Sequence, residues 1–169
     1  MELTAEIADG WLPFMYSPTR GQDIYKNSLE SGFSKSGVTE KKEKFEIVTT
    51  VFGRVCEENE IDEYLYPARN IYTLYVGGMG AKSKNFYYNL FCEYGYEDIA
   101  DELQNLYLSG KKKESEQLFP RELLDELTLV GTKKDIEKKL EKWKDSNITE
   151  ISLSLPIDFE TVKFIKELL

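Results

Sequence analysis

The chain has 169 residues, of which 41% are hydrophobic and 31% charged, and its 22 basic and 31 acidic residues give a net charge of −9. This length suffices for one domain with a hydrophobic core, and the composition is that of an ordered globular protein. The acidic balance disfavours nucleic acids and anionic membranes as partners, because both select a concentrated basic face. No apolar run approaches the roughly 20 residues of a membrane helix, and the cytoplasm is the expected compartment.

Two cysteines and no histidine limit the chemistry that the chain can carry. Zinc sites need more ligands of these types, and a nucleophile activated by histidine is excluded. We therefore expect no metal site, and the sequence by itself identifies no catalytic residue.

The first third of the chain alternates helices and strands. Apolar residues at helical spacing predict a helix over 1–9 that Gly10 ends, followed by a short strand at Trp11–Phe14. A second amphipathic helix, begun near residue 20, is expected to end near Gly32. The β-branched and aromatic run Phe45–Phe52 predicts a strand that is covered on both faces, as in a parallel sheet.

The remainder begins with a long helical stretch over 57–127, broken only at glycines and prolines. It is too long for one crossover helix, so we expect an inserted layer of helices. Thr132 and Asp135 form a capping box for the next helix, Glu150–Leu155 alternates Ile or Leu with serine as a strand does, and Asp158 caps a terminal helix. This order predicts an α/β fold with about three parallel strands.

Three groups of segments carry a family resemblance. They are Ala5–Pro13 with Ser17-Pro18; Tyr75–Ala81 with Asn85–Tyr87 and Tyr94–Tyr96; and Leu106–Gly110 with Pro120–Asp125 and Leu129–Thr132. In this order they resemble the C-terminal part of luciferase-like monooxygenases and deazaflavin-dependent oxidoreductases similar to methylenetetrahydromethanopterin reductase. The resemblance implies the C-terminal part of a TIM (β/α)8 barrel, with 1–169 as a single incomplete domain and 57–127 as its helical insertion. The serines of 150–155 would then face the barrel interior.

The resemblance also implies a function. Family members use flavin mononucleotide (FMN) or the 8-hydroxy-5-deazaflavin coenzyme, and Tyr75–Ala81 favours the deazaflavin. They carry roughly five strands before the helix that opens this chain, and that half supplies most cofactor contacts. We therefore expect a truncated product or a fragment that binds neither cofactor alone and shapes the substrate side for hydride transfer to or from a small organic molecule.

The expected partner is a chain carrying the N-terminal half barrel, or further copies of this chain in a homo-oligomer. The alternative function is a non-catalytic remnant or a self-assembling half-barrel module. Whether the chain is an enzyme by itself is left open.

The loops that follow barrel strands are the places where TIM barrels hold their chemistry. Here they are 13–20, 53–58 and 156–158. Arg20, in the first loop, could bind a phosphate or carboxylate of a ligand; the alternative is an exposed arginine at a helix start.

A glycine-rich segment is the second candidate for binding cofactor or substrate. Gly77, Gly78 and Gly80, with Met79 between them, would let the backbone approach a bound group, and Lys82 would lie near an anionic tail. The alternative is a structural turn between two helices with solvated lysines.

Overall fold

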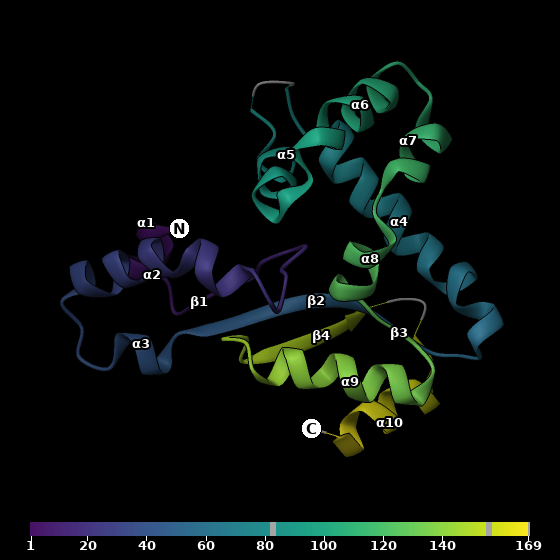
Figure 1. Ribbon diagram of the computed structural model, residues 1–169. Coiled ribbons are helices and arrows are strands. Elements are labelled where there is room, and N and C mark those ends of the chain that lie inside the picture. The colour runs from purple at the N-terminus through teal and green to yellow at the C-terminus, as the bar shows by residue number, and fades with distance from the viewer. Residues whose placement is uncertain (82–83, 155–156, 169) are drawn as a thin grey trace.

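The computed structural model describes residues 1–81, 84–154 and 157–168 (Figure 1). The elements, in chain order, are α1 (Glu2–Ile7), β1 (Gly10–Trp11), α2 (Gly21–Ser36), α3 (Lys41–Lys44), β2 (Glu46–Val55), η1 (Glu58–Glu60), α4 (Ile61–Gly78), α5 (Phe86–Phe91), η2 (Cys92–Tyr96), α6 (Glu97–Leu108), α7 (Lys112–Leu118), α8 (Arg121–Leu127), β3 (Leu129–Gly131), α9 (Lys133–Lys144), β4 (Glu150–Ser154) and α10 (Phe159–Leu168).

The long strand β2 organises the sheet, and every pairing is parallel. Its first residues pair with β1, its middle with β4 from Val48↔Glu150 to Phe52↔Ser154, and its end with β3. The predicted α/β fold with parallel strands is confirmed. β3 is not predicted by the sequence pattern, because its three residues are all buried and show no alternation of apolar and polar side chains.

Gly10 and Gly32 were both predicted to end helices, but neither glycine lies at a helix end in the structure. Gly10 lies in β1, where a Cβ atom would come within 2.7 Å of the Glu46 carbonyl oxygen. Gly32 lies inside α2, where a Cβ atom would come within 2.6 Å of the Ala5 side chain in α1. α2 instead ends at Gly37, whose φ of 65° is left-handed. Both predictions were wrong because these glycines permit close approach between elements distant in sequence.

The strand predicted at Trp11–Phe14 is also shorter in the structure, and it ends at Trp11. Pro13 has no N–H group to donate to a ladder. Met15 then takes a left-handed φ of 57°, which turns the chain. The Phe14 ring packs against tyrosines of α4. β2, in contrast, continues beyond the predicted Phe52 to Val55.

The two faces of the sheet differ in their cover. On one face, Ile47 and Val51 are buried. On the same face, Gly53 lies next to the side chains of Leu153 in β4 and Ile165 in α10. On the other face, Val48 and Thr50 are half-buried and Ser152 is exposed. Ile151 and Leu153 of β4 thus lie on the face that packs on α10, as predicted, and the serines lie on the other face, where Phe52 packs against Tyr72 of α4. Leu155 lies outside the described residues.

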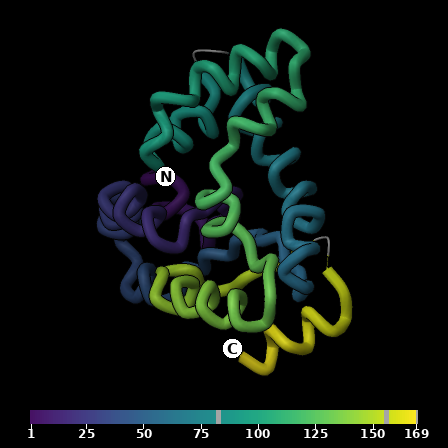
Figure 2. Tube along the Cα trace, turned by 45° about the vertical axis from the view of Figure 1, so that its right-hand side comes forward, coloured from purple at the N-terminus to yellow at the C-terminus, as the bar shows by residue number. Residues whose placement is uncertain are grey.

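The stretch 57–127 is helical in its described part, which confirms the predicted layer of helices. α5, α6 and α7 lie together at the top of Figure 1, and α4 connects them with the end of β2. The view of Figure 2, turned by 45°, also shows these helices above the sheet. α4 buries Leu65, Ala68, Tyr72 and Val76 at helical spacing. Among the described residues, no helix is both long and apolar enough to cross a membrane.

The helix α9 begins at the predicted capping box, and its predicted inner face of Ile136, Leu140 and Trp143 is buried. The Thr132 hydroxyl accepts from the Asp135 N–H, and the Asp135 carboxylate accepts from the Thr132 N–H at 3.1 Å. The bond from the Thr132 hydroxyl is the largest cause that lowers the pKa of Asp135.

We expect Thr132→Ala to lower the free energy of unfolding by about 1 kcal/mol at neutral pH, because the first turn of α9 loses its cap. A folded-state pKa below the ordinary value means that the Asp135 contribution is present above pH 3.8 and is lost as pH falls through the depressed value. The deficit of the variant should therefore shrink in acid. Urea unfolding at neutral pH and in acid measures the difference in free energy of unfolding between the variant and the native chain. Thr39→Ala, at an exposed position, is the control. An equal difference at both pH values would contradict the role of the Asp135 carboxylate.

Candidate functional site

The helix α4 follows the carboxyl end of β2 and contacts β3, and barrel enzymes hold their active sites at the carboxyl ends of strands. Near the start of α4, the Tyr64 ring lies under the guanidinium of Arg54, close to the end of β2. Two turns later, Tyr72 contacts both Phe52 of β2 and Phe14, which follows β1. One face of a single helix therefore fixes side chains from two neighbouring strand ends.

Arg54 forms the polar part of this site, together with Asp158 at the start of α10. Its Nη1 lies 2.6 Å from the Asp158 carboxylate, and its guanidinium carbon lies 4.6 Å from the centre of the Tyr64 ring. Asp158 also accepts the Thr161 N–H at 2.8 Å, which confirms the predicted cap. The bonds from Thr161 and then the charge of Arg54 hold the pKa of Asp158 below its ordinary value.

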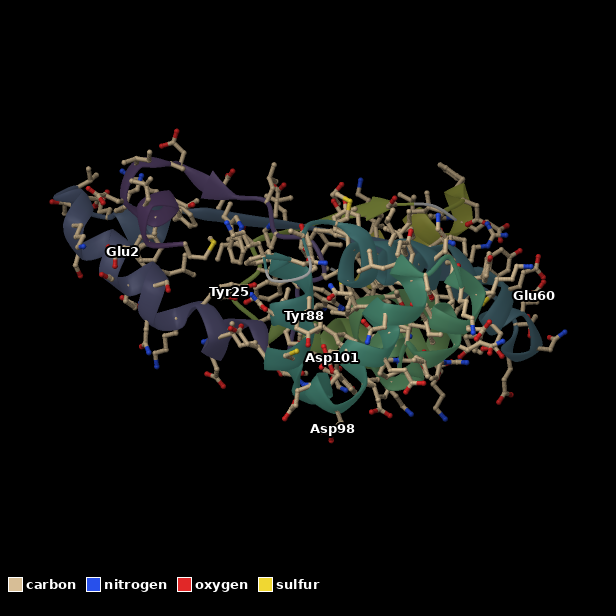
Figure 3. All side chains as sticks on the ribbon, turned by 90° about the horizontal axis from the view of Figure 1, so that it is seen from above. Glu2, Tyr25, Glu60, Tyr88, Asp98 and Asp101 are labelled. Carbon is tan, nitrogen blue, oxygen red and sulfur yellow. The ribbon has the colours of Figure 1, made fainter. Side chains whose placement is uncertain are left out.

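An aromatic wall, made of Phe14, Tyr75 and Tyr87, forms the apolar part of the site. The Phe14 and Tyr75 ring centres are 4.6 Å apart, and those of Tyr75 and Tyr87 are 4.7 Å apart. All three side chains are half-buried, and Phe86 beside them is 51% exposed. Tyr88 follows in sequence but bonds to Asp101, and Figure 3 shows these two residues close together. The wall offers aromatic surface next to the end of β1.

The predicted ligand-binding residue Arg20 is engaged within the protein. Its Nη1 donates to the Tyr94 carbonyl oxygen at 3.0 Å, and its Nη2 lies 3.3 Å from the Glu126 carboxylate. The Ser17 hydroxyl donates to the same carboxylate. These contacts tie the loop after β1 to α8 and η2. A ligand at Arg20 would have to replace them, and its binding role stays a prediction.

The glycine-rich segment lies at the end of α4, against α6. A Cβ atom on Gly77 would come within 2.6 Å of Tyr107, and one on Gly78 within 2.5 Å of the same ring. Met79 is 47% exposed and Gly80 has a φ of 140°. The structure thus gives two of these glycines a packing role, while their binding role stays a prediction. The candidate Lys82 lies outside the described residues.

Arg54 and Tyr64 were not predicted from the sequence. Tyr75 and Tyr87 lie in segments that carry the family resemblance, but they were not predicted as site residues. The loops 53–58 and 156–158, which hold Arg54 and Asp158, were predicted. The available signal was an arginine in the loop that directly follows a strand predicted to be covered on both faces.

Arg54 and the aromatic wall line neither of two cavities in the described part of the chain. These cavities, of about 450 and 440 Å³, lie elsewhere, one beside β4 and one between α2 and the start of β2. No group of three or more His, Cys, Asp or Glu side chains in the described part of the chain could hold a metal ion.

Comparison with known proteins relates the chain to one family. The family described as luciferase-like monooxygenase matches residues 1–150. A Mycobacterium tuberculosis protein, named as a coenzyme F420-dependent oxidoreductase, is 35% identical over 147 residues, which are 87% of this chain and 42% of that protein.

Two solved structures share the fold. The coenzyme F420-dependent tetrahydromethanopterin reductase of Methanopyrus kandleri matches with a TM-score of 0.70 and 14% identity, over 99% of this chain and 46% of that one. An F420-dependent secondary alcohol dehydrogenase with a bound F420–acetone adduct matches with a TM-score of 0.64 and 15% identity, over 99% of this chain and 44% of that one.

The chain therefore spans less than half the length of each relative. The expected fold, part of a luciferase-like TIM barrel, is confirmed. With the family match over 1–150 and the mycobacterial relative, the chain belongs to the luciferase-like monooxygenase family.

Proposed function

We propose that the chain forms the substrate side of a coenzyme F420-dependent oxidoreductase acting on a small organic molecule. The observations that carry this proposal are an aromatic wall at the loop after β1 and Arg54 near the carboxyl end of the neighbouring β2, both in contact with α4. The name of the mycobacterial relative supports the deazaflavin over a flavin. The coenzyme would supply the hydride chemistry, and this chain would position the substrate. The cytoplasm is the proposed compartment, supported by two free cysteines.

We further propose that the site is completed by a companion polypeptide carrying the rest of the barrel. The apolar Ile151 and Leu153 of β4 are only half-buried. Trp143 is 3% exposed, yet its indole N–H has no partner among the described residues, and it lines the cavity of about 450 Å³ beside β4. A buried donor of this kind calls for an acceptor. A further strand along β4 would cover the apolar side chains and could supply the acceptor.

A chimera tests this function directly. In it, the chain replaces the matched segment of the mycobacterial relative, so that one polypeptide carries a whole barrel. We expect the chimera to bind coenzyme F420 in a fluorescence titration at micromolar concentration, and the chain alone to bind neither F420 nor FMN. The unmatched part of the relative is the control. Micromolar binding by the chain alone, or a folded chimera that binds no F420, would refute the proposal.

Self-assembly is the second candidate function, and the exposed apolar surface favours it. Leu12 is 79% exposed and β4 is half-exposed along its length, and uncovered strands tend to pair between chains. Light scattering of the chain, alone and with the unmatched part of the relative, distinguishes self-assembly from assembly with a companion polypeptide. A stable homo-oligomer that does not dissociate when the unmatched part of the relative is added would favour self-assembly over a companion.

A further inference from the structure

We propose that Arg54 anchors an anionic group, a carboxylate or a phosphate, of the ligand that binds at the ends of β2 and β4. This inference rests on the proposed function, since the ligand would be the substrate or the coenzyme of that site. It adds the chemical class that this part of the site selects.

The hydrogen bonds of Arg54 leave several of its donors free for such a group. A guanidinium has five N–H donors in a planar fork. Nη1 forms the ion pair with the Asp158 carboxylate, while Nη2 donates only a long hydrogen bond of 3.4 Å to the Tyr64 hydroxyl. Nε is buried and has no partner among the described residues. The side chain is 24% exposed, so Nη2 can meet a ligand.

The orientation of this guanidinium is fixed before any ligand arrives. Tyr64 supports one face of the group, and the Asp158 carboxylate holds one edge. Little side-chain entropy then remains to be lost on binding, which favours a planar, bidentate partner. Carboxylate and phosphate oxygens have that geometry.

Asp158 sets the strength of this site because it already carries the charge that a ligand would bring. Its carboxylate neutralises Arg54 and repels an incoming anion. Asp158→Asn should therefore strengthen anion binding, while asparagine still caps α10. Removing a unit charge a few ångströms away should lower the dissociation constant on the order of fivefold or more.

The test is an NMR titration of the ¹⁵N-labelled chain with inorganic phosphate and, separately, with malonate. We expect a saturable shift, with at least one probe, of the Arg54 Nε–H signal and of the backbone amide signals of Gly53 and Val55 beside it. Only the backbone signals are compared between variants, because the Arg54 variants have no Nε–H group. Arg54→Gln should abolish the saturable response, Arg54→Lys should weaken it, and Asp158→Asn should tighten it. Arg69→Gln is the matched control, because Arg69 also has an Nε without a partner in the described part of the chain but lies on α4 beside α7. A response that survives in folded Arg54→Gln, or that Asp158→Asn does not tighten, overturns the inference.

The chimera distinguishes the possible sources of the anion. Competition between the probe and coenzyme F420 would assign the site to the coenzyme, and independent binding would assign it to the substrate. The two proposals can also fail separately. If the chimera binds F420 but no response depends on Arg54, only this inference is contradicted. If a response depends on Arg54 but the chimera does not bind F420, only the proposed function is contradicted.

Discussion

Replacing Gly77 by valine is expected to lower the free energy of unfolding by about 3 kcal/mol, at the upper end of the usual cost of overpacking. The new side chain would begin 2.6 Å from Cβ and 2.7 Å from Cγ of Tyr107. These atoms lie near the backbone of α6, so a rotamer change cannot move them away. The two helices would have to separate, and urea unfolding measures the loss.

Two further variants show whether close packing is the cause. Tyr107→Gly removes both the Cβ and the Cγ atom, so it should remove most of the penalty of Gly77→Val, because residues in contact do not act additively. Gly110→Ala is the glycine control: its φ is 85° and nothing lies within 4 Å of a Cβ atom there. It should cost about 1 kcal/mol, through backbone conformation alone. If Gly77→Val is as stable as the native chain, the packing role is wrong.

The features that the sequence predicted well are encoded within a few neighbouring residues. Thr132 and Asp135 bond to each other's backbone, so their spacing suffices to place the start of α9. The cap at Asp158 is local in the same sense. Long helical periodicity likewise revealed the layer between β2 and β3.

The features that it missed depend on residues far apart in the chain. Gly32 ends no helix because α1 crosses it, and helical spacing within α2 carries no information on that contact. The same holds for Gly77, where the nearest atoms belong to α6. A glycine needed for a turn and a glycine needed for close approach are identical in sequence.

The candidate site was predictable in its place and not in its residues. TIM barrels hold their active sites on the loops that follow the strands, and Arg54 and Asp158 lie in two of the loops predicted on that ground. That rule could not reveal that Tyr64 of α4 orients Arg54, because that contact follows from the direction in which α4 leaves β2. Asp158 was identified as a cap, and its ion pair with Arg54 depends on the parallel neighbours β2 and β4.

Tyr72→Ala is expected to have the largest effect of all, a loss of about 4 kcal/mol. The Tyr72 side chain is fully buried and contacts Phe14, Phe52 and Phe119, so its removal leaves a cavity between the sheet and the helices. Its hydroxyl also donates to the Leu127 carbonyl oxygen at 3.2 Å. Tyr72→Phe should lose only about 1 kcal/mol, the value of one hydrogen bond.

The cavity should also weaken the coupling between the two parts of the fold. Trp11 lies in β1, and Trp143 lies in α9, which contacts β3. Their fluorescence therefore follows the sheet and the helix packed on it, whereas circular dichroism follows all the helices. In the native chain we expect the two unfolding curves to coincide, as for one cooperative unit. In Tyr72→Ala they should separate, because α4 joins the helical layer to β2 through this side chain. Tyr66→Ala, in the same helix but 48% exposed, should change stability by no more than about 0.5 kcal/mol. If the curves of Tyr72→Ala coincide and its loss matches that of Tyr66→Ala, α4 is not the element that holds the site to the sheet.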